Sequence, residues 1–185
     1  MTSNGMKKKI FDYAMYAMFR VRPFTRTCGI MVSREMHDGD VVLEIGSGGK
    51  SESKKYYFSM EKFFDTKKIM FIKSDLNPNY GVKVVDIEHF ADVEKYNHIL
   101  CFHVLDDVYE WQKALLNLYG ALKKGGALHV VLPGFNGLDY KSDYYRFTEK
   151  LIYKFCEDND FLLEKCVIHG YKRFPFAYYI RIKKL

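Results

Sequence analysis

The sequence predicts an α/β fold in which a mostly parallel sheet carries helices on both faces. Between positions 41 and 133, apolar runs of strand length alternate with stretches of helical spacing, as in strands joined by crossover helices. The first run, Val41–Ile45, is followed by Gly-Ser-Gly-Gly, and such small residues allow a sharp turn close to a ligand. Because parallel strands share a carboxyl edge, we expect the loops after them to meet there.

Length and composition favour one domain. The 185 residues are 48% hydrophobic and 17% aromatic, which indicates a packed core rather than a disordered chain. We expect a single domain over 1–185, with a helical and basic cap segment over 1–38 and the core over 39–185. The four cysteines are scattered without metal-site spacing, so no metal is expected, and no long uncharged apolar run indicates a spanning helix. These features predict a cytoplasmic protein.

The amino-terminal segment is basic and contains a predicted helix over 10–21, which we expect to end before Pro23. Its apolar face either packs on the domain or docks on a membrane surface, and packing is the simpler interpretation. Residues 20–26 interleave arginines with aromatic and turn residues, so they could contact an anionic group of a substrate or form a solvated linker. The net charge of +6 fits either acidic partners or a lysine-rich solvated surface.

Carboxylates follow the next two predicted strands. After a helix expected over 52–64 and a strand over 68–72, the chain reaches Asp75, and a carboxylate there can accept hydrogen bonds from both ribose hydroxyls of a nucleoside. The alternative is an aspartate that caps the turn before Asn77-Pro78. Asp86 follows the third apolar run, over 82–85. Together with the glycine turn, these carboxylates predict a nucleotide-type site at one edge of the sheet.

The run Glu44-Ile-Gly46-Ser-Gly48 resembles motif I of the class I S-adenosylmethionine-dependent methyltransferases. A dinucleotide site would instead need Gly-x-Gly-x-x-Gly, and the third glycine position is Ser51. The resemblance continues over residues 98–133. There a strand leads to Val-Leu-Asp-Asp-Val where the family has Val-Leu-Glu-His-Val, and a helix over 111–122 precedes Lys-Lys-Gly-Gly where the family has Leu-Lys-Pro-Gly-Gly.

The resemblance covers residues 41–161 and implies a Rossmann-like fold with S-adenosylmethionine as cofactor. The expected sheet has seven strands, mostly parallel, with one antiparallel strand near the carboxyl terminus. In the family, the aspartate after the third strand lies near the adenine amino group and the next residue lies near the ring. The residues that match cofactor-binding positions are Glu44, Gly46, Gly48, Asp75, Leu76, Asp86, Ile87, Phe102 and His103.

A second resembling run lies at 139–149. Its Asp-Tyr-aromatic-Arg-aromatic-Thr pattern is similar to one in small methyltransferases, several of them associated with glycan or cell-surface biosynthesis. It implies that Tyr144, Tyr145 and Arg146 bind the acceptor, whereas the plainer interpretation is packing for the tyrosines and an ion pair for the arginine. Thr148 is a natural cap for a helix over 150–159. The apolar runs 162–169 and 177–182 predict an antiparallel pair of strands.

These residues together predict methyl transfer from S-adenosylmethionine to a small-molecule or saccharide-type acceptor. The sulfonium already activates the methyl group, so the protein mainly positions the acceptor and removes its proton. Asp107 and His103 are the first candidates for the catalytic base, followed by Asp106 and Tyr144. Two alternatives stay open: a catalytically silent methyltransferase-like binding module, and an RNA methyltransferase, which the absence of an Asn-Pro-Pro-Tyr motif disfavours.

Overall fold

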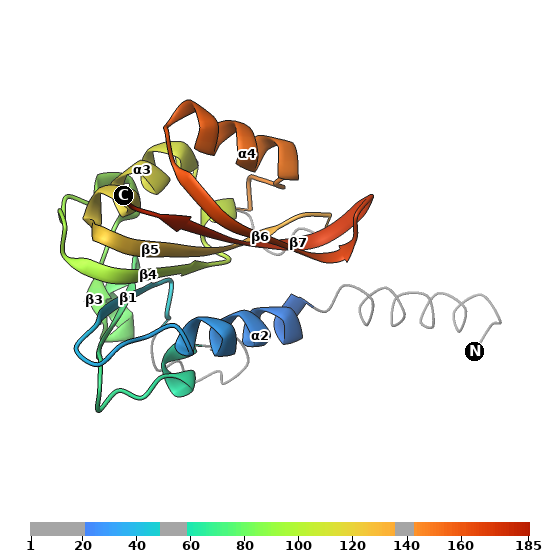
Figure 1. Ribbon diagram of the computed structural model, residues 1–185. Coiled ribbons are helices and arrows are strands. Elements are labelled where there is room, and N and C mark those ends of the chain that lie inside the picture. Colours follow the sequence, from blue (N-terminus) through green and yellow to red (C-terminus); the bar gives the residue numbers. More distant parts are fainter. Residues whose placement is uncertain (1–20, 49–58, 136–142) are drawn as a thin grey trace, which may run out of the picture.

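Seven strands form one sheet in the order β3-β2-β1-β4-β5-β7-β6 (Figure 1). The computed structural model describes residues 21–48, 59–135 and 143–185. Strands β1 to β5 pair in parallel with one another, and β7 runs antiparallel to both β5 and β6. The strands are β1 Val41–Ile45, β2 Met70–Asp75, β3 Lys83–Val84, β4 Tyr96–Phe102, β5 Leu122–Pro133, β6 Leu162–Tyr171 and β7 Phe174–Lys183. The predicted mostly parallel sheet with one antiparallel strand near the carboxyl terminus is confirmed.

Helices cover both faces of the sheet, as predicted. Helices α3, Trp111–Ala121, and α4, Glu149–Asp158, lie on one face, and α2, Val21–Ser33, lies on the other (Figure 1). Because successive strand residues point to opposite faces, each central strand contributes to two cores. Leu43 and Ile45 of β1 join the α3 core, while Val42 between them joins the α2 core.

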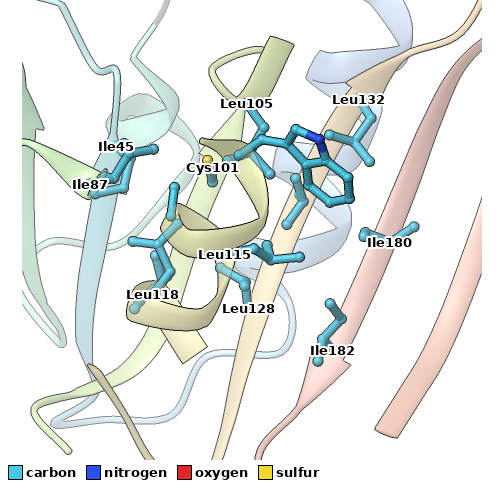
Figure 2. Packing of buried hydrophobic residues seen from close by; sticks show 14 of the residues in the cluster. Ile45, Ile87, Cys101, Leu105, Leu115, Leu118, Leu128, Leu132, Ile180 and Ile182 are labelled. Carbon is cyan, nitrogen blue, oxygen red and sulfur yellow. The ribbon is translucent and has the colours of Figure 1, made fainter. Parts of the chain in front are cut away.

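The larger core lies between the sheet and helix α3. Leu115 and Leu118 of α3 share this cluster with Leu128 of β5 and Ile180 of β7, and all four side chains are buried (Figure 2). Leu105, in the loop after strand β4, belongs to the same cluster and is 1% exposed. The loop after β4 is therefore anchored in the core at its first turn.

The predicted end of the first helix before Pro23 is wrong. Residues 10–20 lie outside the described residues, but α2 begins at Val21 and continues through Pro23 to Ser33. Proline is compatible with the first turn of a helix, because the first N–H groups have no carbonyl partner within the helix. The hydroxyl of Thr27 donates to the Pro23 carbonyl at 3.0 Å. The arginine- and aromatic-containing stretch from Val21 to Arg26 is thus helix rather than linker.

Other predicted elements are found with shifted ends. Of the helix expected over 52–64, residues 52–58 lie outside the described residues, and Met60–Phe63 form a short 3-10 helix, η1. Helix α4 begins after Thr148, whose hydroxyl oxygen accepts from the Leu151 N–H as predicted. Strand β5 begins four residues before Gly126, because the chain bulges there while pairing with β4. No helix among the described residues is long and apolar enough to cross a membrane.

A chain of buried polar groups crosses the sheet on the face that α2 covers. His98 Nε2 lies 3.4 Å from the Asp40 carboxylate, and its Nδ1 lies 3.0 Å from His129 Nε2. His129 Nδ1 lies 2.8 Å from the hydroxyl of Tyr179. Burial lowers the pKa of His98 to about 4, against a smaller opposing effect of Asp40, and burial also lowers the pKa of His129 well below its usual value. Both imidazoles are therefore neutral in the folded protein at pH 7.

We predict that the contribution of His98 to the free energy of unfolding falls as the pH decreases from about 6.5, the ordinary histidine pKa, toward 4. The imidazole of His98 takes up a proton in this range in the unfolded chain and does not when it is buried in the folded chain. The variant His98→Gln keeps hydrogen-bonding groups but cannot titrate, so it should lose less stability over this range, by up to about 3 kcal/mol. Urea unfolding of both proteins at pH 7 and pH 4.5 measures the difference. Equal losses would contradict the prediction.

Candidate functional site

The turn after β1 has a backbone that favours glycine. Gly46 and Gly48 have φ values of 69° and 66°, in the left-handed region. Between them, the Ser47 N–H donates to the Ser74 carbonyl at 2.9 Å, which fixes the turn to the end of β2. The Gly48 N–H donates to the Asp75 carboxylate, also at 2.9 Å. The structure therefore joins the glycine turn and the predicted ribose-binding aspartate directly.

Asp75 bonds to the glycine turn and also caps the turn that follows it. Its Oδ2 accepts from Gly48, and its Oδ1 accepts from the Asn77 N–H at 3.0 Å, the turn-capping bond of the alternative interpretation. Each carboxylate oxygen has a further lone pair, so both oxygens can still accept from a pair of hydroxyls. Leu76 follows with a side chain that is 65% exposed. This carboxylate could therefore accept hydrogen bonds from two neighbouring hydroxyls, such as those of a ribose.

The same turn also contacts the loop after β4. A Cβ atom added to Gly46 would lie 2.5 Å from Cγ2 of Val104, so the two loops are in close contact. Strands β1 and β4 are neighbours, and the chain leaves β1 toward β2 and β3 before returning to β4. This is the place where the strand order reverses, the usual ligand-binding position in such sheets. Val104 has no sequence signal of its own, because only strand pairing brings it to Gly46.

Asp86 and Ile87 lie at the end of the neighbouring strand β3. The Val85 N–H donates to the Asp75 carbonyl at 3.0 Å, which holds this loop beside the end of β2. The Asp86 carboxylate caps the short helix η3, Ile87–His89, through the Glu88 N–H and the His89 ring, and the bond with His89 lowers its pKa. Asp86 remains partly exposed, whereas the Ile87 side chain is buried in the core.

Glu44 is engaged away from the turn. Its buried carboxylate accepts from the Ser59 hydroxyl and from the Met60 N–H, both at 2.6 Å. Burial raises its pKa to about 7, although these two hydrogen bonds lower it. The observed role of Glu44 is therefore to position helix η1 against the sheet. Nothing in the sequence near residue 59 indicates this partner.

Phe102 and His103 end strand β4. Phe102 is partly buried in the α2 core. His103 has a φ of 55°, rare for a residue other than glycine, and its N–H donates to the Val131 carbonyl at 3.0 Å. Its ring Nε2 lies 2.7 Å from the hydroxyl of Thr25 in α2, and burial lowers its pKa to about 4. Sequence reasoning missed Thr25, since the two residues are 78 positions apart.

The segment 143–147 packs against the loop after β4. The N–H groups of Tyr144 and Tyr145 both donate to the carbonyl of Asp106, at 2.8 and 3.3 Å. The Tyr145 hydroxyl donates to the Tyr109 carbonyl at 2.7 Å, and the rings of Tyr109 and Tyr144 meet edge to face. Asp107 closes the 3-10 turn η4, Leu105–Asp107, through its N–H to the Val104 carbonyl. The predicted acceptor-binding segment therefore lies against the loop that contains Asp107.

Arg146 is held within its own segment. Its guanidinium makes a two-point ion pair with Asp143 and donates to the Tyr145 carbonyl at 2.7 Å. Asp143 is almost fully buried in this pair. The ion pair of the plainer interpretation is present, and it shapes the segment that presents Tyr144. The described residues contain no group of three or more His, Cys, Asp or Glu side chains arranged for a metal.

The architecture is that of the class I S-adenosylmethionine-dependent methyltransferases, a Rossmann-like fold. No protein-family model matches the chain, and no curated protein matches its sequence. Solved structures do match. A SAM-dependent methyltransferase of Methanosarcina mazei is 15% identical, with a TM-score of 0.62, and the match covers 84% of this chain and 97% of that chain.

Two further matches have similar scores. 1,6-Didemethyltoxoflavin-N1-methyltransferase of Burkholderia thailandensis, solved with 1,6-didemethyltoxoflavin and S-adenosylhomocysteine, is 13% identical with a TM-score of 0.64, covering 100% of this chain and 91% of that one. The third match is one chain of a Haloferax volcanii complex that contains the Trm112 methyltransferase activator. It is 13% identical with a TM-score of 0.67, and the match covers 93% of this chain and 94% of that one. At these identities the similarity shows the fold alone.

We predict that Gly46→Ala lowers the free energy of unfolding by about 2–4 kcal/mol, because it adds backbone strain and a clash with Val104. Gly81→Ala is the matched control. Gly81 has a φ of 68° and open space around its Cα, so it should show only the backbone part, about 1 kcal/mol. Urea unfolding measures both. Adding Val104→Ala should recover part of the loss at Gly46, and additive losses would contradict the proposed contact.

Proposed function

We propose that the protein transfers a methyl group from S-adenosylmethionine to a small-molecule or saccharide-type acceptor. One observation carries the proposal: the Gly48 N–H is bonded to the Asp75 carboxylate at the place where the strand order of the sheet reverses. The loop after β1 contacts both the loop after β2 and the loop after β4 there. The fold, which is that of known methyltransferases, supports this assignment.

In this proposal the residues of the turn hold the adenosyl group. Asp75 accepts the ribose hydroxyls, Asp86 and the Ile87 backbone lie toward the adenine, and Gly46 and Gly48 let the backbone approach closely. Leu76, Phe102 and His103 complete the surroundings, and Glu44 acts indirectly through η1. The cofactor supplies an electrophilic methyl group, so no protein nucleophile is required. The protein orients the acceptor and takes its proton, for which the sequence offers Asp107 and His103.

The surface beside this turn suits a small acceptor. Tyr109 and Tyr144 are 70% and 55% exposed, and their rings lie next to the loop that carries Asp106 and Asp107. Exposed aromatic faces pack against flat or sugar-like rings. The Burkholderia thailandensis structure holds a small-molecule acceptor, 1,6-didemethyltoxoflavin, in the same overall fold. We therefore propose that Tyr144 and Tyr145 contact the acceptor and that Arg146 orders their segment.

We predict that Asp75→Asn weakens the binding of S-adenosylhomocysteine by about 10-fold or more. The amide has one acceptor oxygen where the carboxylate has two, so an NH₂ group would face either the Gly48 or the Asn77 N–H. Isothermal titration calorimetry with the full chain measures the change.

The matched control is Asp65→Asn. Asp65 also accepts from an N–H two residues ahead, that of Lys67 at 3.2 Å, but it lies before β2 rather than after it. Binding by this variant should equal that of the wild type. The absence of saturable binding in the wild type would refute the methyltransferase assignment and favour a silent binding module. Salt-sensitive retention of RNA in a filter-binding assay would instead favour a nucleic-acid substrate.

A further inference from the structure

We propose that Asp106 is the catalytic base, and that its carboxylate takes a proton from a hydroxyl or amine group of the acceptor. This inference rests on the proposed methyl transfer. From the sequence alone, Asp107 and His103 are the first candidates for this base, and Asp106 comes after them. The geometry of the loop after β4 carries it.

Asp106 is held close to the glycine turn by its neighbours in the chain. Leu105 is buried in the α3 core (Figure 2), and Val104 touches Gly46. The two residues before Asp106 are therefore fixed by packing. The short turn η4 is closed by the Asp107 N–H to the Val104 carbonyl. The backbone of Asp106 is therefore held in place by the packing and the hydrogen bonds of its neighbours in the chain.

The Asp106 side chain has a buried carboxylate oxygen, Oδ1, that accepts no hydrogen bond from the described part of the chain. A buried, unpaired carboxylate oxygen is costly, and such groups commonly mark functional sites. The Tyr144 and Tyr145 N–H groups bond to the backbone carbonyl of Asp106 instead, so the proposed acceptor-binding segment lies against this residue while Oδ1 remains available.

The surrounding charges prepare the carboxylate to accept a proton. The pKa of Asp106 is raised to about 7, chiefly by burial and to a smaller extent by the neighbouring Asp107 and Asp143, although a hydrogen bond with its own backbone and the charge of Arg146 lower it. A base is most effective when its pKa lies near the working pH. In contrast, the His103 ring has Nε2 engaged by Thr25, and burial lowers its pKa to about 4, which makes it a weak base.

The proton balance follows directly. A lone pair of the acceptor oxygen or nitrogen forms the new bond to the methyl carbon, and the carbon–sulfur bond breaks with its electron pair remaining on sulfur. The proton of the acceptor O–H or N–H passes to Oδ1 of Asp106 and is later released to solvent. The positive charge of the sulfonium is thereby lost as a proton, and no other reactant is needed.

Sinefungin provides a test that does not require the acceptor. In this analogue of S-adenosylmethionine, a carbon bearing an amino group replaces the sulfonium and its methyl group, so its ammonium takes the place of the transferable methyl group, next to the acceptor. If Asp106 faces that position, the wild type should bind sinefungin about 10-fold more tightly than S-adenosylhomocysteine at pH 8. The preference should shrink toward pH 6 as the carboxylate is protonated. Calorimetry measures both affinities.

Two variants separate the neighbouring carboxylates. Asp106→Asn should keep the affinity for S-adenosylhomocysteine and lose the preference for sinefungin, while Asp107→Asn should keep that preference. Loss of the preference in Asp107→Asn alone would assign the proton to Asp107 and overturn the inference. If the wild type binds S-adenosylhomocysteine without preferring sinefungin, the inference fails while the proposed function stands. If the wild type binds neither compound, both fail.

A second readout needs no ligand. The raised pKa means that the ionised carboxylate costs folding stability, and this cost is complete above pH 7 and absent below the unfolded pKa of about 4. Asp106→Asn should therefore raise the Tm at pH 8 by about 3 °C or more and leave it nearly unchanged at pH 4. A purely structural aspartate, stabilised by Arg146, would show a lower Tm at pH 8 when replaced, and this result would contradict the inference.

Discussion

The parallel pairing of β1 with both β2 and β4 is the constraint on which the site depends. It brings three chain segments that are distant in sequence to one edge, where their carboxyl ends leave backbone groups without ladder partners. In the glycine turn, the N–H groups of Ser47 and Gly48 find partners in Ser74 and Asp75 at the end of β2. On the other side of the turn, Gly46 lies against Val104. Only a residue without a side chain fits at position 46, so the site geometry follows from the sheet topology and one small residue.

The fold could be predicted from sequence because its signals are local and repeated. Apolar runs of strand length, the glycine turn and the helix cap at Thr148 each depend on a few adjacent residues. The errors have the same origin. Pro23 ends a helix when it lies in the interior but not in the first turn, and the local pattern alone did not indicate which applied.

Part of the candidate site could also be predicted from adjacent residues in the sequence. Asp75 and Gly48 follow directly from their positions at strand ends, and the structure brings them to hydrogen-bonding distance. The partners of Glu44 and His103 were not predictable, because Ser59, Met60 and Thr25 come from elements whose packing only the complete fold determines. The difference between Asp106 and Asp107 is of this kind as well. Adjacent identical residues differ only in what surrounds them.

The hydrogen bonds that Tyr144 and Tyr145 donate to Asp106 are made by backbone atoms. Other side chains at 144 and 145 would therefore keep these two hydrogen bonds, although they would change the contacts that both tyrosines make with Tyr109. Ring size, polarity and reach at those two positions can change over evolutionary time while the carboxylate stays where it is. Such a division would allow related proteins to acquire new acceptors by exchanging two surface residues, with the rest of the scaffold left intact.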